Sequence, residues 1–260
     1  MQGKKLVQEI YKYRWLLEQL IARDLKNKYR KSVLGYLWSV LNPLLMMTIM
    51  TIVFSQLFRF QIPNYPVYLL SGQLIFAFFS EATNAGMQGI LDNGAIIKKV
   101  YLPKYIFPFS RVLSSFTTMI FSMVALLIVM LGSGTPFHGT LILVPVVLIY
   151  ILAFSIGVGI LLSALLVFFR DLSYLWGVFL TAVSYLTPIF YPADILPQWS
   201  NPLMVFNPLY DYISMFRKLV LYGTWPTWQE HAICIGFALL ALILGAWVFK
   251  RKQRDFILYI

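Results

Sequence analysis

Residues 141–169 read LILVPVVLIYILAFSIGVGILLSALLVFF, a run that holds no charged residue. A helix needs about 20 mainly apolar residues to cross a hydrocarbon core of about 30 Å, and this run is longer than that. The whole chain of 260 residues is 60% hydrophobic and 12% charged, with a mean hydropathy of +0.75. This composition predicts an all-α polytopic membrane protein. We expect six transmembrane helices in a single domain, at residues 35–58, 67–90, 106–131, 141–169, 174–191 and 232–249.

The chain has a net charge of +11, and its basic residues are concentrated on one side of the predicted spans. Of the 21 basic residues, all but Arg59, Arg217 and Lys218 lie before the first span or just after the second, fourth or sixth. Cytoplasmic loops of membrane proteins carry an excess of Lys and Arg. We therefore predict that both termini, including the tail at residues 250–260, are on the cytoplasmic side of a cytoplasmic membrane. No nucleic-acid partner is expected.

Residues 1–33 form a basic segment with apolar residues at helical spacing, namely Tyr13, Leu16, Leu17, Leu20, Ile21 and Leu25. A basic amphipathic helix lies at the headgroup level of a membrane rather than crossing it. The segment therefore predicts an interfacial helix that contacts lipid. Simple positive-inside anchoring explains the same charges.

Residues 93–108 read NGAIIKKVYLPKYIFP, a basic amphipathic piece between the second and third spans. Charge placement puts it in the cytoplasm. Its composition fits a docking element for another protein and a positively charged loop equally well.

The region after the fifth span, at residues 192–228, is rich in proline and yet apolar. Prolines at 192, 197, 202 and 208 prevent an uninterrupted spanning helix. Short re-entrant helices at the outer face fit this composition, because irregular backbone at membrane depth must be buried against protein or line a cavity. An ordinary extracytoplasmic loop is the alternative.

Glu81 is the only acidic residue well inside a predicted span. A carboxylate there costs roughly 2.5–3.5 kcal/mol on insertion scales, so it should be paired, protonated or facing a wet cavity. A proton-coupled transporter would use such an acid. A structural or pore-facing role is favoured, because a single acid without a second intramembrane carboxylate, histidine or basic partner makes a poor proton relay.

Motifs for catalysis and nucleotide binding are missing from the sequence. It contains no G-x-x-x-x-G-K-[ST], H-E-x-x-H or G-x-S-x-G, and Cys234 is its lone cysteine. These absences disfavour an enzyme, an ATP site on this chain and a metal site. No bound cofactor is expected.

Four motifs in order resemble one transporter family. They are LGYLWSVLNPL (34–44), NGAIIKKVYLPKYIFP, TPIFYP (187–192) and FNPLYDY (206–212). The chain is similar to ABC-2 permeases, and most similar to the group that exports O-antigen, capsular polymer or teichoic acid. The resemblance implies a homodimer paired with two copies of a separate ATPase subunit, which would bind ATP and Mg.

The resemblance also implies roles for particular residues. Residues 93–105 would be a coupling helix that docks on the ATPase: Ile96, Ile97, Val100 and Tyr101 would enter an apolar cleft, and Lys98 and Lys99 would meet its acidic rim. Aromatic and hydroxyl groups would line a polymer channel, namely Tyr36, Trp38, Tyr174, Thr181 and Tyr185. Tyr36, Trp38 and Tyr174 fit an interfacial aromatic belt as well.

The cargo implied by the resemblance is a polysaccharide on a polyprenyl-pyrophosphate carrier. Basic residues where such a carrier would enter are Lys26, Lys28, Arg30 and Lys31. Competing functions are export of drugs or lipids by the same family, proton-coupled secondary transport, and membrane glycosyl- or phosphotransfer, for which the sequence supplies no acid or base.

Overall fold

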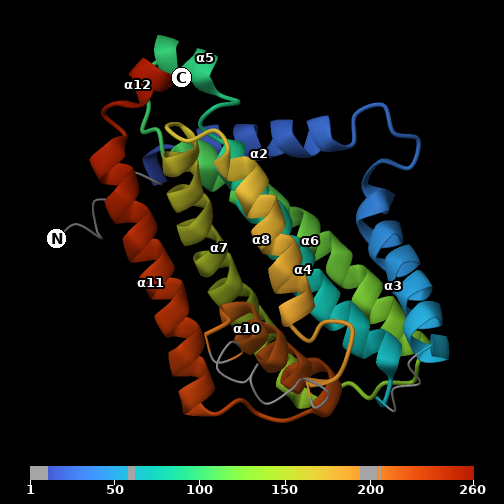
Figure 1. Ribbon diagram of the computed structural model, residues 1–260. Helices are drawn as coiled ribbons and strands as arrows, with labels where there is room; N and C mark the ends of the chain where they lie inside the picture. The colour runs from blue at the N-terminus through green and yellow to red at the C-terminus, as the bar shows by residue number, and fades with distance from the viewer. Residues whose placement is uncertain (1–10, 58–61, 194–203, 205) are drawn as a thin grey trace.

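The computed structural model describes residues 11–57, 62–193, 204 and 206–260. This part of the chain is helical and contains no strand. Six of the described helices form a bundle (Figure 1), namely α3 (Trp38–Leu57), α4 (Tyr65–Gln88), α6 (Ile106–Gly132), α7 (Val144–Leu166), α8 (Leu172–Leu186) and α11 (Trp228–Lys252). Other elements join or flank them, namely α2 (Arg14–Lys28), α5 (Gly94–Lys99), α10 (Pro208–Arg217), α12 (Phe256–Tyr259), the 3₁₀ turns η1 (Gly35–Leu37) and η2 (Gly139–Leu143), and the π turn η5 (Lys218–Tyr222).

Within the part of the chain that the structure describes, four helical segments are long and apolar enough to cross a membrane: Gly35–Phe54, Ile106–Gly132, Gly139–Leu166 and Trp228–Lys252. The other two predicted spans correspond to α4 and α8. Polar residues in the second half of α4, among them Glu81, lower its hydropathy. Helix α8 ends at Leu186 because Thr187 is extended before Pro188, so it has only 15 residues. The six-span topology therefore stays a prediction.

Glycines set the closest helix contacts in the bundle. A Cβ at Gly157 of α7 would overlap the backbone of Ala241 in α11, and one at Gly245 would overlap the Gly157 carbonyl. A Cβ at Gly89 would lie 2.8 Å from the Pro108 Cα of α6. Small residues let helix backbones approach closely where no water drives association. These positions hold α7 against α11, and the end of α4 against α6.

Helix α2 lies across the end of the bundle where α5 and α12 are found (Figure 1). Leu17 and Leu20 of α2 are buried in a cluster that also holds Phe107 of α6 and Phe256 of α12. The chain turns after α2 at Lys31, whose φ of 65° is unusual for a residue with a side chain. That turn directs the chain from α2 into α3.

At the other end of the bundle, α10 packs against α4, α7 and α11. Its last residue, Arg217, is 5% exposed. The guanidinium donates to the backbone oxygens of Tyr68 (3.1 Å), Pro188 (2.7 Å) and Ile189 (3.0 Å), and it lies 3.5 Å from the centre of the Tyr68 ring. Arg217 therefore ties α4 and the start of the proline-rich region to α10. Residues 194–203 and 205 of the predicted outer region lie outside the described residues.

Candidate functional site

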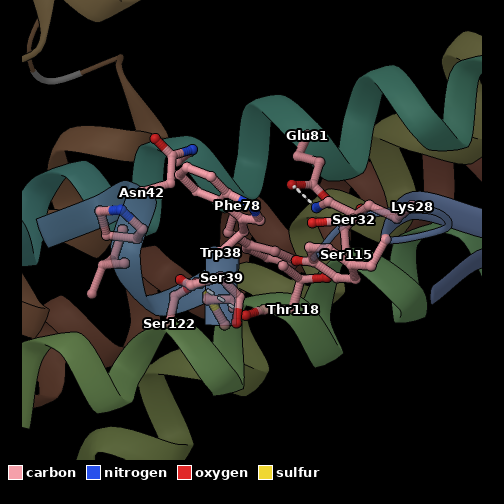
Figure 2. Close-up of a pocket in the computed structure, with 15 residues that line it drawn as sticks. Lys28, Ser32, Trp38, Ser39, Asn42, Phe78, Glu81, Ser115, Thr118 and Ser122 are labelled. Atoms are coloured by element: carbon pink, nitrogen blue, oxygen red, sulfur yellow. Dashed lines mark hydrogen bonds and ion pairs between the residues drawn. The ribbon is translucent and has the colours of Figure 1, made fainter. Parts of the chain in front are cut away.

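The candidate site is a cavity of about 400 Å³ beneath the C-terminal end of α2, between α3, α4 and α6. Figure 2 shows its lining. Three residues that the sequence singled out line it, namely Lys28, Trp38 and Glu81. Cavities of roughly 300–1,000 Å³ are typical of small-molecule sites. The cavity is therefore large enough to hold part of a ligand.

Glu81 forms an ion pair with Lys28 at the edge of this cavity. Both carboxylate oxygens accept from Lys28 Nζ at 2.7 Å (Figure 2). The side chains are 43% and 38% exposed. The sequence predicted that Glu81 would be paired, protonated or facing a wet cavity. In the structure Glu81 is paired with a cation and lies in the wall of a cavity. The partner is 53 residues away in the sequence, which is why residue order did not reveal it.

Hydroxyl groups of α6 form a second wall. Ser115, Thr118 and Ser122 follow each other at helical spacing and all line the cavity (Figure 2). Ser122 Oγ donates to the Ser39 backbone oxygen at 2.7 Å. The sequence analysis did not predict this wall. The pattern that could have indicated it is a series of serines and threonines three and four residues apart in an apolar span.

Tyr29 and Tyr36 lie together beside the cavity. Their ring centres are 4.9 Å apart. Burial, followed by the charge of Glu81, raises the pKa of Tyr29. The predicted channel residue Tyr36 therefore packs against a cavity residue, and Trp38 contributes to the lining itself.

The other predicted channel residues lie elsewhere. Tyr174, Thr181 and Tyr185 are on the exposed face of α8, and the two tyrosines are 78% and 68% exposed. The opposite face of α8 is anchored by Trp176, whose ring nitrogen donates to Thr83 Oγ1 at 3.1 Å. Helix α3 packs on α4 and α6, whereas α8 packs on α4 and α7. A channel that combines both groups stays a prediction.

Of the four basic residues predicted to bind a pyrophosphate, one lines the cavity and three do not. Lys28 lines the cavity and is paired with Glu81. Lys26, Arg30 and Lys31 are exposed and do not line the cavity. The role of these four residues at a pyrophosphate entry stays a prediction.

The predicted coupling segment contains the six-residue helix α5. Ile97 is 7% exposed and packs in the cluster with Phe107 and Phe256, whereas Val100 and Tyr101 are 51% and 103% exposed. Ile96 and Lys99 are also exposed. The predicted apolar surface therefore consists of Ile96, Val100 and Tyr101, and Ile97 anchors the segment from within.

Two lysines of this segment contact the chain's own C-terminal region. Lys98 Nζ donates to the Ile260 backbone oxygen at 2.5 Å, and Lys104 Nζ donates to the Gln253 backbone oxygen at 2.6 Å. Burial lowers the pKa of Lys104, and the charge of Asp255 opposes that effect. Helix α12 thus lies beside α5, as Figure 1 shows.

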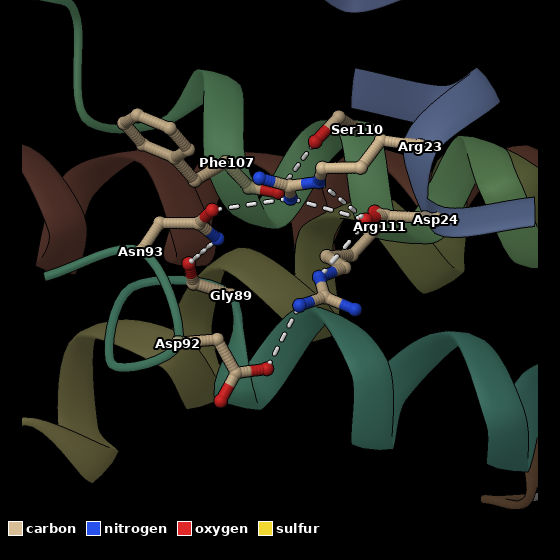
Figure 3. A network of polar contacts seen from close by, with 8 residues as sticks. All are labelled: Arg23, Asp24, Gly89, Asp92, Asn93, Phe107, Ser110 and Arg111. Carbon is tan, nitrogen blue, oxygen red and sulfur yellow. Dashed lines mark hydrogen bonds and ion pairs between the residues drawn. The ribbon is translucent and has the colours of Figure 1, made fainter. Parts of the chain in front are cut away.

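A polar network joins α2 to the start of α5 and to α6 (Figure 3). Asp24, whose side chain is 6% exposed, pairs with Arg23 at 3.0 Å and with Arg111 at 3.4 Å. Arg23 also donates to Asn93 Oδ1 at 3.1 Å, and Arg111 donates to Asp92 Oδ2 at 2.9 Å. The residues just before α5 are therefore held by charges on two other helices. The apolar pattern of α2 did not reveal that its buried face includes an acid.

The sequence matches one known family of transporters. The family model of the ABC-2 type transporter matches residues 16–221, which is most of the chain. The chain belongs to the ABC-2 type transporter family. The match includes the cavity, the polar network and α5, and it leaves α11 and α12 outside.

Named relatives extend over almost the whole chain. An O-antigen export system permease protein RfbA of Klebsiella pneumoniae is 31% identical over 242 residues, which cover 93% of each chain. A protein of the same name from Myxococcus xanthus is 28% identical over 254 residues, covering 97% of this chain and 98% of the relative. The polysialic acid transport protein KpsM of Escherichia coli is 23% identical over 246 residues, covering 92% and 93%.

Proposed function

We propose that this chain is the permease subunit of an ATP-binding-cassette exporter that moves a lipid-linked, O-antigen-like polysaccharide outward across the cytoplasmic membrane. The observation that carries the proposal is the similarity over nearly the full length to permeases whose names specify export of O-antigen or polysialic acid. Membership in the ABC-2 type transporter family supports the class of transporter independently.

The energy for transport comes, in this proposal, from a separate ATPase subunit that binds ATP and Mg. The sequence has no P-loop of its own. The exposed side chains of Val100 and Tyr101, with Ile96 and Lys99 beside them, form an amphipathic surface suited to such a partner. Two ATPase copies would serve a homodimer of this chain.

The same proposal assigns six spans, α3, α4, α6, α7, α8 and α11, with both termini in the cytoplasm. The excess of Lys and Arg before α3 and after α11 supports this orientation. A homodimer would place the exposed aromatic face of α8 against a second copy, where Tyr174 and Tyr185 would line a path for the polymer. Flat rings stack on sugar faces without holding them rigidly.

A proton-coupled transporter is the alternative that uses Glu81. The structure pairs Glu81 with Lys28 at 2.7 Å. The predicted spans offer no second carboxylate or histidine with which Glu81 would form a proton relay. Export of drugs or lipids by the same family differs from our proposal only in cargo.

The test is a transport assay with the purified permease and its ATPase in proteoliposomes. We expect outward movement of the lipid-linked glycan to require ATP and to stop when the catalytic glutamate of the ATPase is replaced by glutamine. ATPase activity should rise with the lipid-linked glycan. Stimulation by small amphiphiles alone would assign a different cargo, and transport that continues with the inactive ATPase would refute the proposal.

A further inference from the structure

The cavity beneath α2 combines two kinds of wall. Helix α6 presents the hydroxyl groups of Ser115 and Thr118, while Trp38 of α3 and Phe78 of α4 present aromatic rings (Figure 2). The Asn42 side chain also lines the cavity. A ligand that fits these walls has apolar faces and many hydroxyl groups at its edges.

The charges around the cavity argue against a phosphate ligand. Among the described residues, Lys28 is the only cation that lines the cavity, and it is already paired with Glu81 at 2.7 Å. A phosphate would have to displace the carboxylate or lie next to it, and like charges repel. Hydroxyl groups meet no such conflict, because they donate to a carboxylate and accept from an ammonium group.

The place of the cavity in the fold agrees with a role early in transport. It lies under α2, at the end of the bundle that also holds α5 (Figure 1). The basic residues before α3 assign that end to the cytoplasm. A ligand that enters from the cytoplasmic side would reach this cavity before the opposite end of the bundle.

We propose that this cavity binds a sugar ring of the exported glycan, with the ring face on Trp38 and its hydroxyl groups on Ser115, Asn42 and the Lys28–Glu81 pair. The site lies within one protomer and is separate from the exposed aromatic face of α8. This inference rests on the proposed function and specifies one place where the cargo is recognised.

A cysteine reporter tests the occupancy of the cavity. The native Cys234 is 0% exposed and contacts Met215 Sδ at 3.8 Å, so it gives little background with a water-soluble maleimide. Met119→Cys places a thiol in the cavity wall without removing a proposed sugar contact, Ala77→Cys is a second reporter there, and Arg251→Cys is the matched control on the exposed end of α11. Each variant is assembled with its ATPase in nanodiscs without nucleotide.

Three probes distinguish a sugar from the rest of the carrier: the lipid-linked glycan, the free glycan released from it, and polyprenyl pyrophosphate without sugar. At about ten times the dissociation constant, bound lipid-linked glycan should slow labelling of the cavity thiols about tenfold. The free glycan should protect them at higher concentration. Labelling of Arg251→Cys should not change.

Two outcomes would overturn the inference. Equal protection by polyprenyl pyrophosphate without sugar would assign the cavity to the phosphate or the acyl chain. No protection of either cavity thiol in nanodiscs whose complex still shows glycan-stimulated ATPase activity would show that the glycan binds elsewhere. In that second case the proposed export function would stand, because it is measured by ATP-dependent transport of the wild-type complex.

Discussion

Replacing Asp24 by asparagine tests whether the network of Figure 3 holds α2 on the bundle. The change preserves the shape of the side chain and removes its charge. The introduced amide could still accept one hydrogen bond from Arg23, but its NH₂ group would face the Arg111 guanidinium, which is also a donor. The substitution therefore leaves two arginines without their shared counter-ion.

The size of the effect follows from the geometry. At 3.0 Å and 3.4 Å, with an effective dielectric constant of about 20, the two pairs set an upper limit of about 5 kcal/mol each. Breaking a buried pair costs about 3–5 kcal/mol. The arginine side chains are 36% and 25% exposed and regain some hydration, so we expect a loss of about 2–3 kcal/mol.

The assay is the thermal unfolding midpoint of the detergent-solubilised protein. A loss of that size lowers the midpoint by roughly 4–12 °C. Asp92→Asn is the matched control: Asp92 is 47% exposed and pairs with Arg111 alone, so its loss should cost about 0.5 kcal/mol and leave the midpoint within about 2 °C. If the two variants unfold at the same temperature, Asp24 does not anchor α2 and the electrostatic reasoning is wrong.

Three further predictions concern other parts of the fold. Gly245→Ala should destabilise the protein by about 1–3 kcal/mol, because the new Cβ would meet the Gly157 carbonyl; the thermal midpoint measures this. Arg217→Lys should cost about 3 kcal/mol, because one ammonium group cannot serve three carbonyls in the guanidinium's fork geometry; faster proteolysis of the outer region would show it. Ile97→Asp should reduce folded yield, whereas Tyr101→Asp should keep the yield and reduce co-purification with the ATPase; equal effects of the two would refute the assignment of Tyr101 to the docking surface.

The sequence predicted the class of fold because hydropathy depends on composition over whole helices. The runs at 106–131 and 141–169 became α6 and α7 with ends that differ by at most a few residues. The run at 174–191 predicted a longer helix than α8, whose end is set by the backbone before Pro188. The hydrophobic pattern continues to residue 191, but the backbone conformation before Pro188 ends the helix at Leu186.

The candidate site was predictable only in part, because it depends on contacts between distant residues. Lys28 and Glu81 were each singled out for separate reasons, and no spacing rule joins residues 53 positions apart. Ile97 was grouped with its exposed neighbours because an amphipathic segment of six residues does not show which side faces its own protein. The family resemblance identified the segment, and only the packing separated its anchor from its surface.

Helix α2 connects the two regions that the proposed function requires. Asp24 and Lys28 are one helical turn apart and share a face, since residues four positions apart are neighbours on a helix. Asp24 is linked through Arg23 to Asn93 at the start of α5, while Lys28 is paired with Glu81 at the cavity. A displacement of α5 by a partner would act first on the Asp24 network and, through the rigid helix, on the ion pair one turn away. The cavity and the α5 surface proposed for the partner are therefore linked through α2, by the Asp24 network on one side and the Lys28–Glu81 pair on the other.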